Sequence, residues 1–370
     1  MREGATMQIK CNVLDRQFQM HQEEYEAAAL KVLRSGWYVL GNEVKQFEEE
    51  FARYTGRTYC VGLNSGLDAL ILSVRALGIG RGDEVIVQAN TYIATVLGIT
   101  ENGAVPVFVE PDKYFNIDTD KIEQAITDRT KAIMIVHLYG QASNMRKITE
   151  IAQKYKLHII EDCAQSHGAC FAGRMTGTFG ISGCFSFYPT KNLGAFGDAG
   201  AVVTDDEAFA QQIRMMRNYG SKVRYYNDVE GVNSRLDEMQ AALLRVKLKY
   251  LPELNAERKA LAKRYHEEIW NSQIQLPECR EGSENIYHQY VVRCSRRDEL
   301  QNYLADKGIQ TQIHYPVPPH LAKCYQHLGH SKGEFPITEG YADEVLSLPI
   351  YTGMTAEEQD YVIEQINLFH

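Results

Sequence analysis

The sequence predicts an α/β domain with a doubly wound, mostly parallel sheet, followed by a smaller α+β domain. Between about residues 56 and 206, short β-branched runs alternate with stretches of helical period, which is typical of βαβ units. After about Pro252 this alternation stops. The chain has 370 residues, of which 44% are hydrophobic, and this is enough for about two domains. We expect the larger domain at residues 1–251 and the smaller one at residues 252–370.

Seven runs are expected to be strands of one sheet. Their nearly continuous apolar character is typical of strands that helices cover on both faces. Two of the intervening helices are expected at residues 67–77 and 147–155. The strand candidates are residues 58–62, 84–88, 105–109, 132–136, 158–160, 184–187 and 201–204.

The C-terminal part has a different order of elements. We expect helices at residues 254–270 and 298–307, and strands at residues 289–293 and 309–313. A last helix is expected after Thr355, because Thr355 and Glu358 have the spacing of a capping box.

Composition excludes several classes of protein. Lys and Arg number 39 against 48 Asp and Glu, and the net charge of −9 argues against a nucleic-acid partner. No apolar run approaches the ~18 residues of a membrane helix, and the first seven residues lack the apolar core of an export signal, so we expect a cytoplasmic protein. The eight cysteines contain no C-x-x-C pair, so we expect neither a metal site nor a disulfide framework.

Ligands of open α/β sheets collect beyond the carboxyl ends of the strands, so residues that follow a predicted strand are the first candidates for a site. After the first strand, Ser65 and Gly66 lead into an apolar helix whose free amides suit a phosphate. Alternatively, Ser65 only caps that helix. After the second strand, Tyr92 either stacks on a flat cofactor or packs in the core.

Charged residues follow two later strands. Asp162 ends an apolar strand, where a buried carboxylate needs a cation or a strong donor, unless it caps the next turn. His167 is either a ligand contact or a satisfied buried histidine. Lys191 lies downstream of Ser186 in a Gly-rich stretch without other basic residues. It is either a surface charge or a candidate Schiff-base former, because an amine sheltered from water loses its proton more readily.

Together these segments offer a phosphate cradle, a stacking aromatic, a buried carboxylate and an isolated lysine. Pyridoxal 5′-phosphate needs all four: anion binding, ring stacking, a counter-charge for its pyridine nitrogen and a lysine that forms an imine. The conjunction favours this cofactor more strongly than any single segment does.

At these residues the sequence resembles the DegT/DnrJ/EryC1/StrS family of sugar-nucleotide aminotransferases. The resemblance covers nearly the whole chain. It is carried by residues 35–41 (SGWYVLG), 65–66 (SG), 161–168 (EDCAQSHG), 189–194 (PTKNLG), 231–237 (GVNSRLD) and 347–349 (SLP).

The resemblance implies the type I pyridoxal-phosphate transferase fold and a homodimer with shared active sites. It implies that Lys191 forms the Schiff base and shuttles protons, that Asp162 pairs with the pyridinium and that Gln165 bonds the ring hydroxyl. Asn233 is implied to reach the phosphate of the neighbouring subunit. The remaining cofactor contacts implied by the resemblance are Gly66, the Leu67 amide and Ser186 at the phosphate and Tyr92 on the ring. The family usually has Thr at the position of Leu67, so phosphate binding here depends more on backbone amides and Ser186.

The implied reaction is a ping-pong transamination from an amino acid, expected to be glutamate, to a keto sugar attached to a nucleotide. The segment at residues 313–320 resembles the branch that aminates C3 of dTDP-3-keto-6-deoxyhexoses. The substrate-site candidates are His314, Tyr315, Tyr188 and His167. Alternatives are a C4-specific aminotransferase, a sugar dehydratase that uses the same cofactor, and a regulatory relative without turnover. The implied dehydratase pattern has His at the position of Lys191, which argues against that alternative.

Two further patterns are expected to be structural. The glycines at residues 78–82 follow a helix and precede a strand, which is the reverse of the order in a dinucleotide-binding loop. His320, Cys324, His327 and His330 have a spacing that imitates a metal-binding face, but Gly329 is expected to break the helix before His330.

Overall fold

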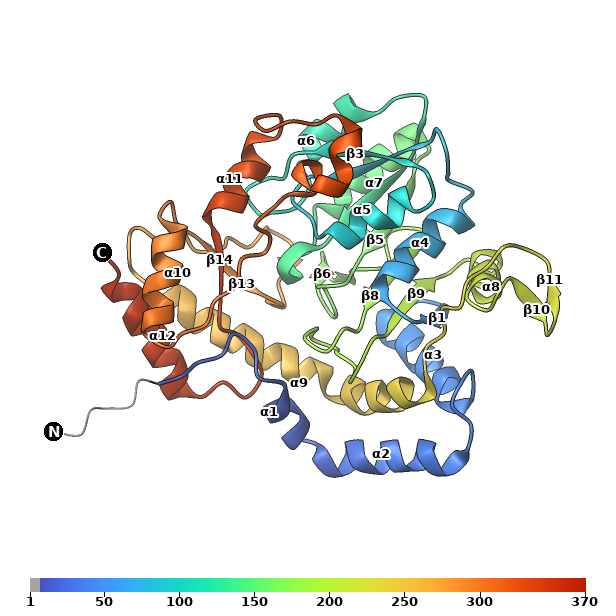
Figure 1. Cartoon of the computed structure of the whole chain (residues 1–370), viewed down its shortest axis with the longest axis horizontal. Coiled ribbons are helices and arrows are strands. Elements are labelled where there is room, and N and C mark those ends of the chain that lie inside the picture. The colour runs from blue at the N-terminus through green and yellow to red at the C-terminus, as the bar shows by residue number, and fades with distance from the viewer. Residues whose placement is uncertain (1–6) are drawn as a thin grey trace.

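The computed structural model of the protein describes residues 7–370, and its centre is a seven-stranded sheet in the order β1-β9-β8-β5-β4-β2-β3 (Figure 1). The strands from β8 to β3 run parallel, while β9 is antiparallel to both β8 and β1. The predicted seven-stranded, mostly parallel sheet is therefore confirmed. The strands are β1 (Tyr59–Leu63), β2 (Glu84–Gln88), β3 (Val105–Val109), β4 (Thr130–Val136), β5 (His158–Asp162), β8 (Ser182–Ser186) and β9 (Gly200–Thr204).

Helices cover both faces of this sheet. One face packs against α4 (Gly66–Ala76), α5 (Ile93–Thr100) and α8 (Glu207–Met216). The opposite face packs against α3 (Asn42–Thr55), α7 (Met145–Tyr155) and α9 (Glu238–Glu268). Because both faces are buried, the strands carry apolar residues almost without alternation. The remaining elements of this part are α1 (Leu14–Gln19), α2 (Gln22–Ser35), α6 (Thr119–Ile122), η1 (Glu123–Ala125), η2 (Leu138–Gly140), β6 (Cys170–Phe171), β7 (Arg174–Met175), β10 (Ser221–Val223) and β11 (Tyr226–Asn227).

The C-terminal part has its own core around an antiparallel pair of strands, β13 and β14. The predicted capping box is confirmed, because Thr355 Oγ1 accepts from the Glu358 amide at 3.2 Å and Glu358 accepts from the Thr355 amide at 2.9 Å. The elements are β12 (Ser283–Glu284), β13 (Tyr290–Arg293), α10 (Arg297–Asp306), η3 (Pro319–Leu321), η4 (Lys323–Leu328), α11 (Pro336–Glu344), β14 (Val345–Leu348) and α12 (Ala356–Leu368).

The helix expected at residues 254–270 begins 16 residues earlier than predicted, since α9 runs from Glu238 to Glu268 through Pro252. A proline inside a helix removes one backbone hydrogen bond. Here the loss is offset by packing, because Leu248, Leu251 and Leu254 are buried on both sides of it. The boundary expected between residues 251 and 252 therefore falls within one helix, and the division into two domains stays a prediction.

The strand expected at residues 309–313 is wrong. This segment makes only isolated bridges, from Ile309 to Ile9 and from Gln312 to Ser347. β13 pairs regularly with β14. The 309–313 segment pairs with β14 at one position, through Gln312 and Ser347.

One observation concerns the expected location of the protein. Within residues 7–370, we find no helix that combines the length and the apolar character needed to span a membrane. The prediction about an export signal concerns a segment that lies almost wholly outside the described residues.

Candidate active site

A cavity of about 460 Å³ lies beyond the carboxyl ends of β2, β4, β5 and β8, which is the edge where ligands of open α/β sheets bind. Most residues that the sequence singles out line it. They are Gly66, Leu67, Tyr92, Asp162, Gln165, Ser186, Tyr188, Lys191, His314 and Tyr315.

The start of α4 forms the anion-binding end of the cavity. Ser65 caps the helix by accepting a hydrogen bond from the Asp68 amide at 3.1 Å, so the capping role proposed as an alternative is present. The first amides of α4 remain available for an anion. A Cβ atom on Gly66 would lie 2.5 Å from Ser186 Cβ, so only glycine lets the helix start approach Ser186 this closely.

Asp162 lies buried on the floor of the cavity and has two donors among residues 7–370. Thr95 Oγ1 donates to its Oδ2 at 2.8 Å, and the Ala164 amide donates to its Oδ1 at 3.1 Å. Burial raises the pKa of this carboxyl, while the two donors and Lys191 act in the opposite direction. An ionised carboxylate has about four acceptor positions, so Asp162 retains capacity for a cationic partner.

Lys191 borders the same cavity on the turn that follows β8. Burial lowers the pKa of its amine to about 8, and the charge of Asp162 acts in the opposite direction. At pH 7 about one-tenth of an amine with this pKa is unprotonated, far more than of an ordinary lysine, and this favours nucleophilic and proton-transfer roles.

Gln165 is held in one orientation. Its Oε1 accepts from the Tyr139 amide at 2.6 Å, and its Nε2 donates to the Tyr315 hydroxyl at 3.0 Å. The amide nitrogen therefore faces the cavity as a donor, which suits a ring hydroxyl or phenolate.

Aromatic and imidazole side chains form the outer wall. The rings of Tyr92 and Tyr315 lie 5.1 Å apart, and Tyr92 and Tyr188 are about half exposed. His314 Nδ1 pairs with Ser347 Oγ at 2.7 Å, and burial lowers the pKa of its imidazole to about 4. His314 is therefore a neutral wall residue over the working pH range.

Two predicted site residues lie away from this wall. His167 is buried against the rings of Phe185 and Phe187, at centroid distances of 5.5 and 5.7 Å, and it is not among the residues that line the cavity. Asn233 is exposed beside Ser234, whose hydroxyl donates to Asp68 at 2.7 Å. Their roles as a substrate contact and as a contact to a neighbouring subunit stay predictions.

The structure adds residues that the sequence reasoning missed. Thr91 and Thr95 are hydrogen-bonded to each other at 2.7 Å, and Thr95 contacts Asp162. Both lie in the segment after β2 that drew attention only through Tyr92. His288 also lines the cavity, and nothing in its local sequence indicates this.

The residues present fit pyridoxal phosphate. The Gly66–Ser186 approach leaves no room for a side chain at the start of α4, where free amides meet a hydroxyl. Asp162 has unused acceptor capacity for a pyridinium, and Lys191 supplies an amine of lowered pKa. Anion site, carboxylate and amine border one cavity, as this cofactor requires.

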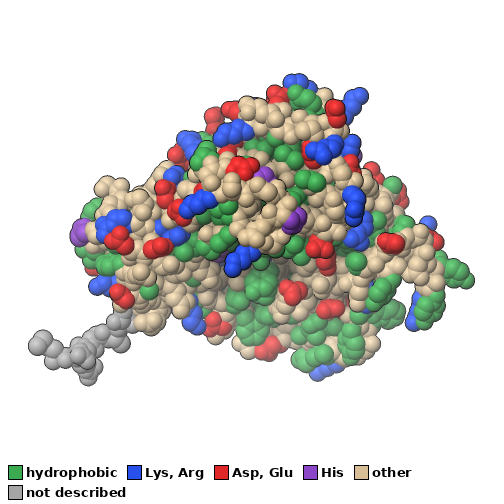
Figure 2. All heavy atoms as spheres, turned by 45° about the horizontal axis from the view of Figure 1, so that its top comes forward, with side chains coloured by type: hydrophobic (Ala, Val, Ile, Leu, Met, Phe, Trp, Pro, Cys, Tyr) green, Lys and Arg blue, Asp and Glu red, His purple; other side chains and the backbone are tan. Residues whose placement is uncertain are grey.

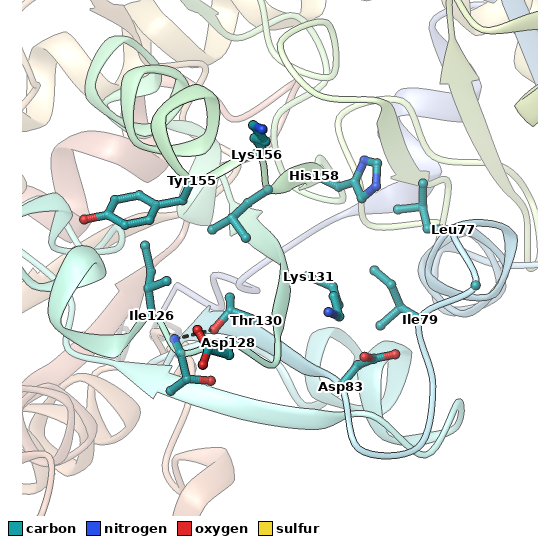
Figure 3. A pocket seen from close by; sticks show the side chains of 13 residues that line it. Leu77, Ile79, Asp83, Ile126, Asp128, Thr130, Lys131, Tyr155, Lys156 and His158 are labelled. Carbon is teal, nitrogen blue, oxygen red and sulfur yellow. Dashed lines mark hydrogen bonds between the residues drawn. The ribbon is translucent and has the colours of Figure 1, made fainter.

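A second hollow, of about 830 Å³, lies at the opposite edge of the sheet (Figure 3). It is lined by segments that precede β2, β4 and β5, including Asp83, Asp128 and Lys156. Although larger, it lies at the amino ends of the strands, away from the strand ends where such folds bind ligands.

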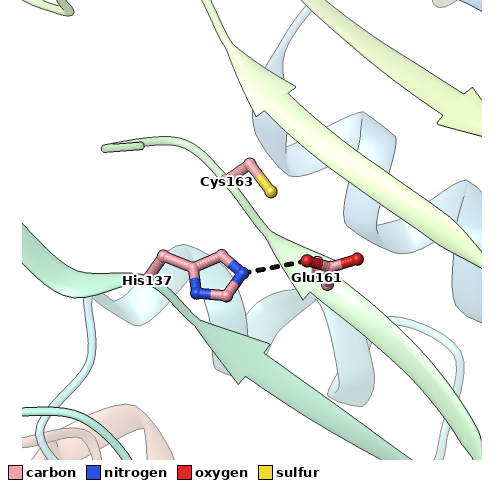
Figure 4. A group of neighbouring side chains, drawn as sticks. All are labelled: His137, Glu161 and Cys163. Atoms are coloured by element: carbon pink, nitrogen blue, oxygen red, sulfur yellow. Dashed lines mark hydrogen bonds and ion pairs between the residues drawn. The ribbon is translucent and has the colours of Figure 1, made fainter. Parts of the chain in front are cut away.

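His137, Glu161 and Cys163 form a buried cluster whose possible metal-ligand atoms lie within 4.8 Å of one another (Figure 4). His137 Nδ1 accepts from the Ser143 amide at 3.1 Å, so Nε2 carries the proton and donates to Glu161 at 3.0 Å. Glu161 also accepts from three backbone amides, those of Gly177, Phe179 and Gly180. His137 and Glu161 are engaged with each other and with the backbone, and this arrangement is that of an internal brace.

Comparison with known proteins agrees with the geometry of the cavity. The model of the DegT/DnrJ/EryC1/StrS aminotransferase family matches residues 19–367. The chain belongs to this family.

Relatives match over nearly their whole length. The chain is 51% identical to dTDP-3-amino-3,6-dideoxy-alpha-D-galactopyranose transaminase from Aneurinibacillus thermoaerophilus, over 94% of this chain and 96% of the relative. The structure of S. venezuelae DesV in complex with a ketimine intermediate superposes with a TM-score of 0.96 at 45% identity, covering 98% of both chains. NtdA from Bacillus subtilis, with bound cofactor PMP, gives a TM-score of 0.91 at 33% identity, covering 99% of this chain and 86% of that one.

The members of this family are aminotransferases with the fold of pyridoxal-phosphate enzymes. The fold and the cofactor inferred from the sequence are therefore confirmed. The protein is a pyridoxal-phosphate-dependent aminotransferase.

Proposed function

We propose that this aminotransferase converts a dTDP-linked 3-keto-6-deoxyhexose into the 3-amino sugar, with glutamate as the amino donor, in the cytoplasm. The single observation that carries the proposal is the cavity that joins Lys191 and Asp162 to a wall containing His314 and Tyr315. The relative from Aneurinibacillus thermoaerophilus, which is named for a dTDP-3-amino sugar, supports this class of substrate.

The residues have distinct tasks. When bound, pyridoxal phosphate supplies an aldehyde that takes up an amine and a ring that accepts an electron pair. Asp162 favours a positive charge on the group that lies against it, because its carboxylate is buried and only partly satisfied. Lys191 holds and moves the proton at Nζ, and Gln165 donates from Nε2. The amides of Gly66 and Leu67 bind the phosphate together with Ser186.

The test is an assay of the purified protein with pyridoxal phosphate, glutamate and a panel of 3-keto and 4-keto nucleotide sugars, with products identified by mass and NMR. We expect amination at C3 of a dTDP-6-deoxyhexose. Lys191→Ala should reduce product formation by at least about 100-fold while the fold is kept. Amination only at C4, dehydration of the sugar, or absence of turnover with every sugar would contradict the proposal and favour one of the alternatives.

We also propose a homodimer in which each site uses both subunits. Large exposed hydrophobic side chains occur on α2 and on the β10–β11 hairpin. They include Leu30, Leu33, Val223 and Tyr226. Figure 2 shows hydrophobic side chains, in green, gathered at the lower right of the molecule. Patches of this kind mark protein interfaces.

Mixing two inactive variants tests the shared site. In a heterodimer of Lys191→Ala and Asn233→Ala chains, one site would carry both changes and the other neither. We expect such heterodimers to regain about half of the wild-type activity. No recovery, with mixed dimers shown by native mass spectrometry, would contradict the cross-subunit role of Asn233.

A further inference from the structure

His288 lines the cavity together with Lys191, and the tasks described above do not include it. It lies just before β13, in the C-terminal part of the chain, and its side chain is 7% exposed. The hydrogen-bond partners of its two ring nitrogens determine what this buried imidazole can do.

A chain of side-chain amides fixes the hydrogen on one of these nitrogens. Asn255 Nδ2 donates to the His167 carbonyl at 2.8 Å, so Asn255 Oδ1 is left to accept from Asn192 Nδ2, also at 2.8 Å. Asn192 Oδ1 therefore faces His288 Nδ1 at 3.1 Å as an acceptor. Because this oxygen can only accept, Nδ1 of His288 carries the hydrogen.

This chain is built closely into the fold. A Cβ atom on Gly168, which has a φ of +95°, would lie 2.8 Å from Asn255 Nδ2. Glycine at this position is therefore what allows Asn255 to reach the neighbouring carbonyl. The amides connect the turn after β5, helix α9 and the residue next to Lys191.

The imidazole of His288 is neutral. Burial is the main cause that lowers its pKa well below the usual value, and the charges of Lys191 and Arg258 act in the same direction, as do His167 and His314. A neutral ring that carries its hydrogen on Nδ1 has a lone pair on Nε2. None of residues 7–370 makes a hydrogen bond to this Nε2, although the side chain borders the cavity.

We propose that His288 is a positioning residue for Lys191: the two side chains border one cavity without a hydrogen bond between them in this structure, and the free Nε2 becomes the acceptor of the Lys191 amine when that side chain turns toward it. The inference rests on the proposed role of Lys191. A single accepted hydrogen bond restricts rotation of the lysine side chain and leaves the nitrogen lone pair free for the substrate. Since His288 stays neutral, it does not compete with Lys191 for the transferred proton.

The matched variant is His288→Asn. An Asn side chain places its amide nitrogen where Nδ1 lies, so the bond to Asn192 is kept while the acceptor at Nε2 is lost. An acceptor stabilises the ammonium form more than the amine, so its removal should lower the pKa of Lys191. We expect a decrease of at least about half a unit.

The direct readout uses the apoprotein. The rate of acylation of Lys191 is followed against pH by peptide mass spectrometry. Burial and the charge of Asp162 alone place the pKa of Lys191 at about 8, so the bond to His288 should place the wild-type midpoint above this value. In His288→Asn the midpoint should fall, and the glutamate half-reaction of the holoenzyme should slow by about tenfold with cofactor retained. An unchanged midpoint, or a change in the Michaelis constant for the sugar alone, would overturn the inference.

A measurement on the wild type avoids any effect of the substitution on folding. The protein is labelled with ¹⁵N-histidine, and the resonances of His288 are assigned by their loss in the variant or by selective relaxation. These resonances should show a protonated Nδ1 and an unprotonated Nε2. The opposite tautomer would overturn the inference. Borohydride labelling separates the two levels: an unlabelled Lys191 in the wild type defeats the proposed function, whereas a labelled Lys191 with unchanged acylation in His288→Asn defeats only this inference.

Discussion

Glu161 and Asp162 are consecutive residues at the end of β5, and their side chains point to opposite faces of the sheet. Both carboxylates are buried. Glu161 accepts four hydrogen bonds from the protein, and its pKa is lowered because His137 and the backbone amides outweigh burial. Asp162 accepts two, and burial raises its pKa. A carboxylate that the fold satisfies completely braces the structure, whereas one that the fold leaves partly satisfied is available to a ligand.

The largest effect on activity is expected from Asp162→Asn. A neutral amide cannot favour a positive charge on the ring against it, so turnover should fall by at least about 100-fold. The Thr95 hydroxyl can turn to accept from the new amide, so the unfolding midpoint of the apoprotein should change little. Wild-type turnover, or a large loss of stability, would break the contrast with Glu161.

Glu161→Gln should have the opposite profile. The new amide group would direct donors at backbone amides of the 177–180 segment, which themselves donate. Removing one partner of a buried pair costs about 3–5 kcal/mol, and this loss should appear in urea unfolding of the apoprotein. Turnover per folded molecule should fall much less than in Asp162→Asn. A variant as stable as the wild type would show that Glu161 is not a brace.

The smallest expected effect concerns a second buried amine, Lys247 on α9, which sharpens the same comparison. Its ammonium group donates to Gln17 and to the Gly194 carbonyl, at 2.5 and 3.3 Å. Burial, with a smaller contribution from Arg258, lowers its pKa to about 7. Burial also lowers the pKa of Lys191, but there the charge of Asp162 acts in the opposite direction. The charge that acts on the buried amine of Lys247 is therefore a cation, Arg258, whereas the charge that acts on Lys191 is an anion, Asp162.

The sign of the pH effect follows from linkage. Between pH 7 and 10.5 the unfolded chain binds the proton of Lys247 and the native chain does not, so native stability should rise with pH in this window. Unfolding free energies of wild type and Lys247→Met, compared at pH 7 and pH 9, should show the wild type gaining about 2 kcal/mol relative to the variant. A difference that does not depend on pH would contradict the lowered pKa.

Much of the fold was readable from the sequence because local signals agreed with it. Continuous apolar runs located all seven strands of the sheet, with ends within two residues of those observed. Helix α9 was misjudged at Pro252, because burial on both sides outweighs the lost hydrogen bond, and a local rule carries no information about that packing.

The site divides in the same way. Residues that directly follow predicted strands, such as Asp162 and Tyr92, were predicted from the rule about strand ends and line the cavity. His288 could not be found, because it enters the cavity from the C-terminal part of the chain and its tautomer depends on Asn192 and Asn255, which are distant in sequence. Such contacts arise from tertiary packing alone.

The most direct test of the central claim is chemical trapping at position 191. The holoenzyme is reduced with borohydride, digested, and its peptides are mapped by mass spectrometry. The account predicts a pyridoxyl group on Lys191, together with a retained but catalytically impaired cofactor complex in Asp162→Asn. A pyridoxyl group on another lysine, or on none, would contradict it.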